Sequence, residues 1–361
     1  MTTTLEQFQS IGRRIASWRR PLLLTHGRAD GDAIGSLLTM RAIFRSLGAD
    51  PQAVLFEPPS DKYVWIDRDD PICVLRWKPP SVESAPPGDA GTGNGRIVEL
   101  DNIFSCDGIL IMDTCAYTQL TPVAERLRAA RRAGNPPIVV VDHHVTRDDV
   151  ADEYMVDESA SATCLILHDW ARACEWRVDD AARLAMFVGI ATDTGWFRFS
   201  NTDQRTLRAA AELVGSGVCP NDIYDRLFES ESVARVRLFG AAVNGMELHD
   251  DDRVAILTVT RSMFETLGAV PADTEDLVNQ ALRIHTVETA ALVADLGGKP
   301  QHVIKISFRS KATVDVAALA GQFGGGGHQR AAGARRYGRL DDVKRDVLAA
   351  LRAAASRPRV D

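Results

Sequence analysis

The stretch that decides the fold class is residues 135–144, which read NPPIVVVDHH. Four consecutive β-branched residues, 138–141, follow two prolines and end at an Asp-His-His triplet. A second apolar run, GILIM at 108–112, ends at Asp113, and PLLLT at 21–25 forms a third. Unbroken apolar strands separated by helical patterns are typical of a parallel sheet that is covered on both faces. The sequence therefore predicts an α/β fold with a mostly parallel sheet in its N-terminal half.

The rest of the chain divides into three parts around this sheet. Further strand patterns cover 52–56, 72–75, 253–259, 289–295 and 302–308, and helical patterns cover about 32–47, 122–133, 160–174, 179–189, 202–213, 218–239, 274–283 and 340–352. We expect a catalytic domain over 1–205, a helical connector over 206–244 and a smaller α/β domain over 245–361. The Pro- and Gly-rich residues 79–96 lack any periodicity, and we interpret them as a surface insertion.

Acidic residues and histidines follow the apolar segments. The clusters are HGRADGDAIGS at 26–36, DTC at 113–115, DHH at 142–144 and TDTGWFRF at 192–199. Three of these clusters, taken alone, are also explained by turns and helix caps, but an ordinary loop seldom needs two adjacent histidines such as His143 and His144. Together they bring five aspartates and three histidines to one edge of the sheet, where like charges repel unless cations neutralise them. A mixed Asp/His set favours Mn²⁺, Mg²⁺, Co²⁺ or Zn²⁺, and the number of ligands suffices for the two-metal arrangement that suits attack on phosphorus.

A glycine-rich segment marks a second candidate site. Residues 323–333 read FGGGGHQRAAG, with four successive glycines before His328. Runs of glycine cost conformational entropy inside a domain, and they allow backbone N–H groups to approach a phosphate or a base closely. A flexible linker is the alternative interpretation, but Gly/Ser linkers rarely end in such a sequence. We therefore expect this segment to bind an anionic part of the substrate.

Composition excludes several classes of protein. The 361 residues carry a net charge of −7, so the chain lacks the broad basic surface that long nucleic acids need, and only 6% are aromatic. The six cysteines form no CxxC pair, which favours free thiols in a reducing compartment. The N-terminus lacks the apolar region of a signal peptide, and no stretch reaches the roughly 18 apolar residues of a membrane span. We expect a cytoplasmic protein that does not bind membranes.

These motifs resemble those of the DHH/DHHA1 phosphoesterases. HGRADGDAIGS, MDTC, VDHH, ATDTGWFRF and FGGGGHQRAAG occur in the family's order, and the resemblance extends from about residue 7 to residue 350. The spacing and the stretch IKISFRSKATVDVAALAGQFGGGGHQRAAG are most similar to the NrnA-type enzymes, which are bifunctional oligoribonucleases and pAp phosphatases. The sequence departs from the family at Ala29, where proline is usual, and at Trp196, where a small residue is usual. We expect Trp196 to pack against the core or to narrow the entrance.

The resemblance implies roles for particular residues. His26 and Asp30 would bind one metal, Asp32 and His143 the other, Asp113 would bridge both, and Asp193 would complete the pair. His144 would face the scissile phosphate, and Asp142 would orient the imidazoles. The residues expected to hold the rest of the substrate are Arg309, Ser310, Gly325, Gly326, Gly327 and His328. Two divalent cations are implied; we expect Mn²⁺, with Mg²⁺ or Co²⁺ as alternatives.

The resulting interpretation is a metal-dependent phosphoesterase. It would hydrolyse short oligoribonucleotides, such as pApA-like dinucleotides, to nucleoside 5′-monophosphates, and dephosphorylate pAp, with the substrate in the cleft between the two domains. Three alternatives stay open: a pyrophosphatase or exopolyphosphatase, a cyclic-dinucleotide phosphodiesterase, and a nucleotide sensor without catalysis. The intact set of motif residues disfavours the sensor. The resemblance also allows a homodimer.

Overall fold

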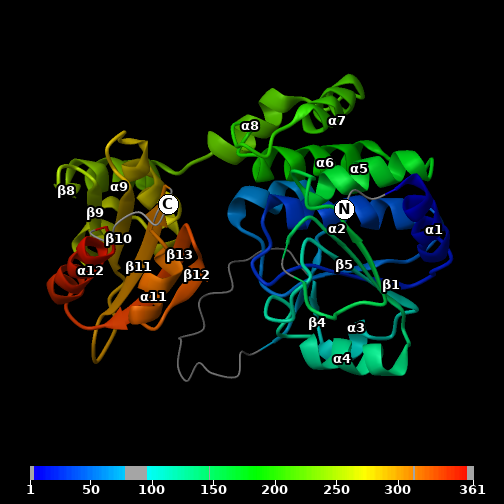
Figure 1. The fold of residues 1–361 in the computed structure, drawn as a ribbon, viewed down its shortest axis with the longest axis horizontal. Coiled ribbons are helices and arrows are strands. Elements are labelled where there is room, and N and C mark those ends of the chain that lie inside the picture. Colours follow the sequence, from blue (N-terminus) through cyan, green and yellow to red (C-terminus); the bar gives the residue numbers. More distant parts are fainter. Residues whose placement is uncertain (1–3, 78–95, 146, 312–313, 356–361) are drawn as a thin grey trace. The chain divides into compact units, whose positions relative to one another are not determined.

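The computed structural model describes residues 4–77, 96–145, 147–311 and 314–355, and it divides into two compact units, Met1–Ser230 and Glu231–Asp361 (Figure 1). The predicted insertion over 79–96 lies outside the described residues except for Arg96. Among the described helices, none is long and apolar enough to cross a membrane. All six cysteines are free thiols.

The first unit contains a seven-stranded sheet in which every neighbouring pair is parallel. Its strands, in spatial order, are β4 (Ile97–Val98), β3 (Cys73–Leu75), β2 (Gln52–Leu55), β1 (Pro21–Leu24), β5 (Gly108–Met112), β6 (Ile138–Asp142) and β7 (Glu153–Val156). The central strands β1, β5 and β6 are buried along their whole length, as their apolar runs predict.

Helices cover both faces of this sheet. The helices of the first unit are α1 (Leu5–Ile15), α2 (Gly31–Ser46), α3 (Leu100–Ile103), α4 (Ala124–Ala133), α5 (Thr163–Ala173), α6 (Asp180–Asp193), α7 (Gln204–Gly215) and α8 (Pro220–Phe228), with a 3-10 helix η1 (Asp61–Asp67). Helices α2, α5 and α6 lie on one face and α3 and α4 on the other (Figure 1). Successive residues of a strand face opposite sides of the sheet. Leu110 of β5 packs into the core under α2, α5 and α6, here called the first core, and Ile109 packs into the second core, under α3 and α4. The predicted α/β fold is confirmed.

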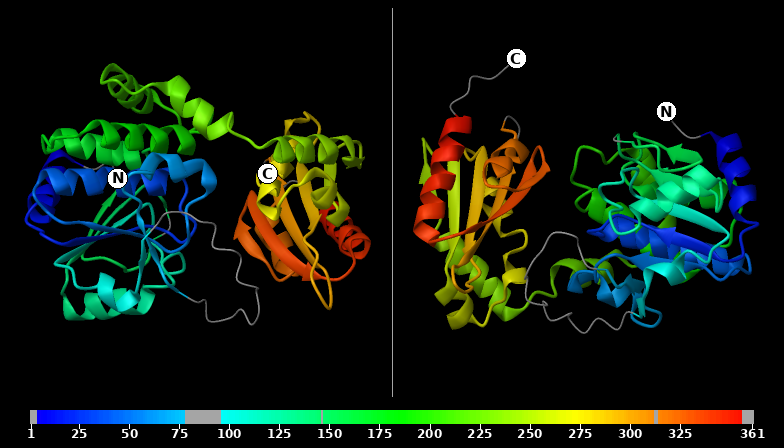
Figure 2. Two further views of the ribbon diagram at one scale, coloured as in Figure 1. Left: turned by 180° about the vertical axis from the view of Figure 1, so that it is seen from behind. Right: turned by 90° about the horizontal axis from the view of Figure 1, so that it is seen from below.

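The second unit contains a mixed six-stranded sheet. Its strands, in spatial order, are β12 (Gly326–His328), β13 (Ala331–Tyr337), β11 (Val303–Ser310), β10 (Thr289–Asp295), β9 (Val254–Val259) and β8 (Glu247–His249). Only the β9–β10 pair is parallel. Helices α11 (Val316–Gln322) and α12 (Leu340–Ala355) cover one face, and α9 (Val233–Asn244), α10 (Arg261–Leu267) and the 3-10 helix η3 (Leu277–Arg283) cover the other (Figure 2).

Several local predictions for this half differ from the structure. The single helix expected over 218–239 is two helices, α8 and α9, which are separated at residues 229–232. The helix expected over 274–283 consists of 3-10 turns, η2 (Pro271–Thr274) and η3. Part of the glycine-rich segment 323–333 is the edge strand β12 and not a loop, because its backbone pairs with β13. Strand β13 was not predicted, since AAGARRY has low strand propensity and its extended form depends on pairing with β11.

Helices α2 and α6 approach each other closely at glycine. A Cβ atom on Gly35 would lie 2.5 Å from the carbonyl oxygen of Ala185 and 3.0 Å from Sγ of Cys164. Both contacts are too short, so a side chain at this position would push the helices apart. The spacing of α2 and α6 matters because the first turn of α2 contains Asp32 and α6 ends at Asp193.

We predict that Gly35→Ala lowers the free energy of unfolding of the first unit by about 1–3 kcal/mol, the usual cost of overpacking. Gly215→Ala is the matched control, because a Cβ there meets nothing within 4 Å. On helix propensity alone, both changes should be neutral or slightly stabilising. Urea denaturation would measure the difference, and equal midpoints for the two variants would contradict the close contact.

Candidate active site

The candidate site lies at the carboxyl ends of three neighbouring strands. His26, Asp30 and Asp32 follow β1, Asp113 follows β5, and Asp142 is the last residue of β6, directly before His143 and His144. Asp193 is the last residue of α6, so it reaches the site from a helix terminus. Ligand sites of open α/β sheets occur at this edge. The sequence predicted this convergence of the polar clusters, and the structure brings their side chains together.

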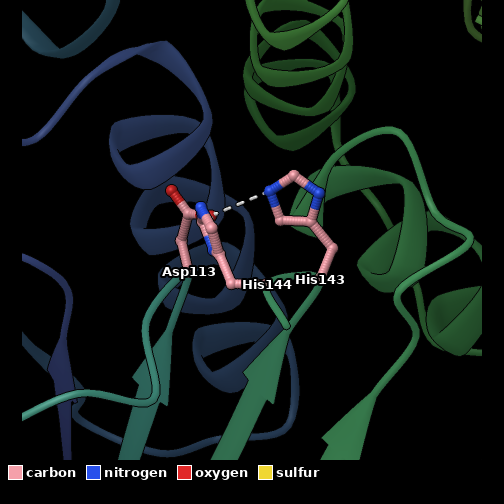
Figure 3. Close-up of side chains that lie close together, drawn as sticks. All are labelled: Asp113, His143 and His144. Carbon is pink, nitrogen blue, oxygen red and sulfur yellow. Dashed lines mark ion pairs between the residues drawn. The ribbon is translucent and has the colours of Figure 1, made fainter. Parts of the chain in front are cut away.

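The carboxylate of Asp113 is at the centre of the cluster. Its Oδ2 lies 3.4 Å from Nε2 of His26. Its Oδ1 lies 3.5 Å from Nε2 of His143 and 3.8 Å from Nδ1 of His144 (Figure 3). The side chain is almost fully buried, and the backbone has a φ of 63°, which Asp tolerates better than most residues. Burial alone would raise the pKa of Asp113, but the hydrogen bonds with His143 and His26 have the larger, opposite effect. The pKa of Asp113 therefore lies well below its usual range.

Two groups of three ligand atoms form around Asp113. His26, Asp30 and Asp113 make one group, and Asp32, His143 and Asp193 make the other; within each, the ligand atoms lie within 4.8 Å of one another. Asp113, His143 and His144 form a third group that overlaps both. The first two groups contain the pairs that the family resemblance implied, His26 with Asp30 and Asp32 with His143. Asp113 belongs to the first group and lies 3.5 Å from His143 of the second.

The backbone fixes the orientation of His143. Its Nδ1 lies 3.2 Å from the carbonyl oxygen of Ala160, which can only accept a hydrogen bond, so Nδ1 carries the proton. Its Nε2 consequently points at Asp113 and lies 3.3 Å from Oδ2 of Asp193. Burial lowers the pKa of His143, but the hydrogen bond with Asp113 and the charges of Asp32 and Asp193 raise it to about 10. These carboxylates therefore favour positive charge at Nε2, the atom that would bind a metal.

Carboxylates are crowded around these histidines. Asp32 is buried, and both its oxygens accept backbone hydrogen bonds from the first turn of α5, at 2.6 Å from Thr163 N and 2.9 Å from Cys164 N. Burial, followed by the charges of Asp113 and Asp193, raises the pKa of Asp32 well above its usual value. Burial and the charge of Asp113 also raise the pKa of Asp193 to about 7. Divalent cations would relieve this repulsion, so the donor set could bind metal ions.

Asp142 holds His144 in place. One oxygen of its fully buried carboxylate, Oδ1, accepts hydrogen bonds from the backbone N–H groups of His143 and His144, at 2.8 and 3.2 Å. The same oxygen lies 2.7 Å from Nδ1 of His144. This contact raises the pKa of His144, although burial opposes it. The imidazole of His144 is half exposed, so it is open to a ligand at the sheet edge.

The segment that precedes α5 supports the site, and sequence reasoning missed it. Asp157 accepts hydrogen bonds from Ser159, and its Oδ2 lies 2.6 Å from Nη1 of Arg205, whose Nε lies 2.7 Å from Oδ2 of Asp169. This network fixes the chain just before Ala160, the partner of His143. The residue types are common and lie outside the motifs, so only the tertiary contacts identify them.

Trp196 packs against the core. Its ring contacts Phe187, Tyr224 and Phe228 edge-on, with centroids 6.0, 5.1 and 5.7 Å apart. It is partly buried against the first core. Of the two roles expected for this departure from the family sequence, core packing is confirmed.

The residues expected to hold the rest of the substrate lie in the second unit. Arg309 and Ser310 are consecutive on β11, where buried and half-buried positions alternate. The hydroxyl of Ser310 donates to the carbonyl of Val314 at 2.7 Å, so the structure does not bring it together with Arg309. Arg309 pairs in register with Ala331 of β13, which pairs with His328 of β12, so the three backbones form one row.

Two of the glycines have a structural reason to be glycine. A Cβ on Gly325 would lie 2.1 Å from the carbonyl oxygen of Gly333, and one on Gly327 would lie 2.6 Å from that of Ala331. A Cβ on Gly326 would meet nothing within 4 Å. The close approach to β13 therefore explains Gly325 and Gly327, whereas the space beside Gly326 is open to a ligand.

Comparisons with known proteins agree with these motifs. Residues 22–190 match the model of the DHH family, N-terminal domain, and residues 252–357 match the DHHA1 domain. The bifunctional oligoribonuclease and PAP phosphatase NrnA of Thermus thermophilus is 32% identical over 345 residues, which cover 93% of this chain and 90% of that protein. The protein of the same name from Bacillus subtilis is 26% identical over 216 residues, covering 59% of this chain and 67% of that protein.

A solved structure shows the same fold. An exopolyphosphatase-related protein from Bacteroides fragilis matches with a TM-score of 0.80 at 21% identity. The match covers 97% of this chain and 96% of that chain.

We predict that Arg205→Met lowers the free energy of unfolding by about 2–3 kcal/mol at neutral pH, because it leaves buried Asp157 without its cation. Burial raises the pKa of Asp157 and Asp169, but hydrogen bonds, including those from Arg205, lower it below the usual value. The stabilisation is therefore complete above the unfolded-state pKa, and it is lost as the pH falls through the folded-state values.

Urea denaturation between pH 7 and about pH 3 would test this expectation. The difference between wild type and Arg205→Met should shrink in acid. Arg172→Met is the control, because Arg172 makes an exposed ion pair with Glu212, which should contribute at most about 1 kcal/mol. A difference that stays constant across this pH range would contradict the assignment.

Proposed function

Because this chain belongs to the family of bifunctional oligoribonucleases and PAP phosphatases with DHH and DHHA1 domains, we propose that it hydrolyses short oligoribonucleotides to nucleoside 5′-monophosphates and removes the 3′-phosphate of pAp. The protein is accordingly a hydrolase of phosphoric ester bonds. The observation that carries the proposal is the convergence of four aspartates and three histidines, all from the family motifs, on one sheet edge: His26, Asp30, Asp32, Asp113, His143, His144 and Asp193.

These residues fit a pair of divalent cations. His26, Asp30 and Asp113 would hold one ion, and Asp32, His143 and Asp193 would hold the other, with Asp113 shared. We propose Mn²⁺, because imidazole and carboxylate together suit it better than Ca²⁺. When bound, the cations would supply Lewis-acid stabilisation of the charge that develops on the phosphoryl oxygens.

His144 is the proposed group that contacts the scissile phosphate. Since Asp142 holds its Nδ1, the opposite nitrogen, Nε2, points away from Asp142. The raised pKa of His144 favours the protonated ring, which donates a hydrogen bond to a phosphoryl oxygen. In the reaction, water supplies the hydroxyl that bonds to phosphorus and the proton that the departing oxygen takes up.

The second unit is proposed to hold the non-reacting part of the substrate. Arg309 and Lys305 are half-buried cations four residues apart on β11. In the described parts of the chain, Lys305 donates a hydrogen bond to the hydroxyl of Thr274 and Arg309 donates one to the carbonyl of Phe308, and neither lies within 4.0 Å of a carboxylate. Burial lowers the pKa of both side chains, so an anionic ligand would stabilise their charge. Together with Gly325, Gly326, Gly327 and His328 of the glycine-rich motif, they would bind the second phosphate or base. Homodimer formation and a cytoplasmic location stay predictions.

A substrate panel tests the proposed function. Purified protein with Mn²⁺ should release mononucleotides from pApA and from oligoribonucleotides of two to a few residues, and phosphate from pAp. Inorganic pyrophosphate, polyphosphate, cyclic di-AMP and long RNA should react far more slowly. Mononucleotide release quantified by chromatography is the measurement, and faster hydrolysis of pyrophosphate or cyclic di-AMP would favour the corresponding alternative function.

Asp113→Asn is the control for the site. Asparagine keeps the shape of the side chain and tolerates the positive φ, but it lacks the negative charge that faces both His26 and His143. Activity should fall by far more than the roughly 10–100-fold typical of residues behind the ligands. A variant that keeps a tenth of wild-type activity at saturating Mn²⁺ would show that the activity does not depend on this site.

We predict that Arg309→Ala lowers kcat/KM for pApA by at least about tenfold, the worth of one charge-assisted hydrogen bond. Hydrolysis of bis-p-nitrophenyl phosphate should stay unchanged, because this small diester has no second nucleotide. Arg345→Ala is the control, since Arg345 is highly exposed on α12. Equal losses on both substrates would contradict a role for Arg309 in capture.

A further inference from the structure

One short segment contacts three of the proposed metal-ligating residues. The carbonyl of Ala160 accepts a hydrogen bond from His143, and the backbone N–H groups of Thr163 and Cys164 bind the two oxygens of Asp32. The hydroxyl of Thr163 donates to Oδ1 of Asp113 at 3.1 Å. Thr163 therefore binds two carboxylates from different segments, Asp32 of α2 and Asp113 after β5, and it lies outside every family motif quoted above.

We propose that Thr163 is a positioning residue, whose hydroxyl sets the rotation of the Asp113 carboxylate between the two ligand groups. This inference rests on the metal site of the proposed function. It deepens that function by naming a residue that acts through Asp113 without contacting the substrate.

The rotation of Asp113 decides which ligand each oxygen faces. Oδ2 lies next to His26, and Oδ1 lies next to His143. A hydrogen bond to Oδ1 alone distinguishes the two oxygens and holds this arrangement. A carboxylate shared between two groups needs such a restraint, because its terminal torsion is otherwise broad. Geometry fixed before binding lowers the free-energy cost of ordering the site.

The capping of α5 shows how Thr163 is held next to Asp113. The helix begins after Ala162, which has no side chain that could cap the first N–H groups. Asp32 of α2 takes that role, so the first turn of α5 is fixed by the same carboxylate that belongs to the second ligand group. Thr163 is fully buried, and its single hydroxyl proton is used on Asp113.

The packing behind Thr163 makes this arrangement rigid. Sγ of Cys164 lies so close to Gly189 and Gly35 that a Cβ on either glycine would come within 2.3 or 3.0 Å of it. The first turn of α5 thus packs tightly against both α2 and α6. The hydroxyl of Thr163 therefore has little freedom to leave Asp113.

The test is a calorimetric titration of EDTA-treated protein with Mn²⁺. Thr163→Val keeps the shape of the side chain and the backbone hydrogen bonds to Asp32 but removes the hydroxyl. We expect its Mn²⁺ affinity to fall by roughly 10–100-fold, the range for residues that orient metal ligands. Thr163→Ser keeps the hydroxyl and should stay within about threefold of wild type, a difference of about 0.65 kcal/mol. In turnover assays, excess Mn²⁺ should restore kcat of Thr163→Val, with KM for pApA unchanged.

Thr39→Val is the matched control. Thr39 is a fully buried threonine of α2, the helix that also contains Asp32, and its hydroxyl has no hydrogen-bond partner among the described residues. This variant should bind Mn²⁺ as wild type does. Thermal unfolding of the metal-free proteins checks that each variant is folded; if Thr163→Val is not, Thr163→Ala against Thr163→Ser gives the same comparison.

The outcomes separate this inference from the proposed function. Wild-type Mn²⁺ affinity in folded Thr163→Val or Thr163→Ala would overturn the role of Thr163 and leave the proposed function standing. An equal loss in Thr163→Ser would also overturn it, because the hydroxyl would not be the cause. A wild-type protein that binds no Mn²⁺ would overturn both.

Discussion

The buried carboxylate of Asp113 is the interaction on which the rest of the site depends. It lies between His26 and His143. Its negative charge raises the pKa values of both histidines and of the neighbouring carboxyl groups of Asp32 and Asp193. A group of this kind is stable only if opposite charge surrounds it. The histidines provide part of that charge, and divalent cations would provide the rest.

The scaffold holds these like charges together against their repulsion. Strands β1, β5 and β6 are fully buried, so the loops after them begin from fixed points. The close approach of α2 and α6 at Gly35 brings Asp32 and Asp193 into one group. The ion pairs of Arg205 with Asp157 and Asp169 fix the segment that carries Ala160 and Thr163. Charges that repel one another are thus placed by apolar packing and by ion pairs outside the cluster.

The sequence was sufficient to predict the sheet and the acidic and histidine side chains that meet at its edge, and insufficient to predict the residues that hold those side chains in place. Asp and His directly after apolar runs are chemically conspicuous, so Asp113 and His143 could be predicted. Thr163 and Arg205 are ordinary residue types whose roles come from contacts 50 and 48 positions away in the chain. Strand β13 was missed for the same reason, because its pairing with β11 overrides a weak local propensity.

The glycine-rich motif shows that one sequence signal can have two physical causes. A binding role alone would need glycine only where a ligand approaches the backbone. Gly325 and Gly327 instead lack a side chain because β13 lies against them, whereas Gly326 borders open space. The pairing of β12 with β13 also puts the backbone of His328 in one row with Ala331 and Arg309. Gly325 and Gly327 therefore allow the edge strand to lie against β13, which brings the backbones of the proposed binding residues into register. The proposed binding role of the motif would thus depend on strand pairing as well as on direct contact.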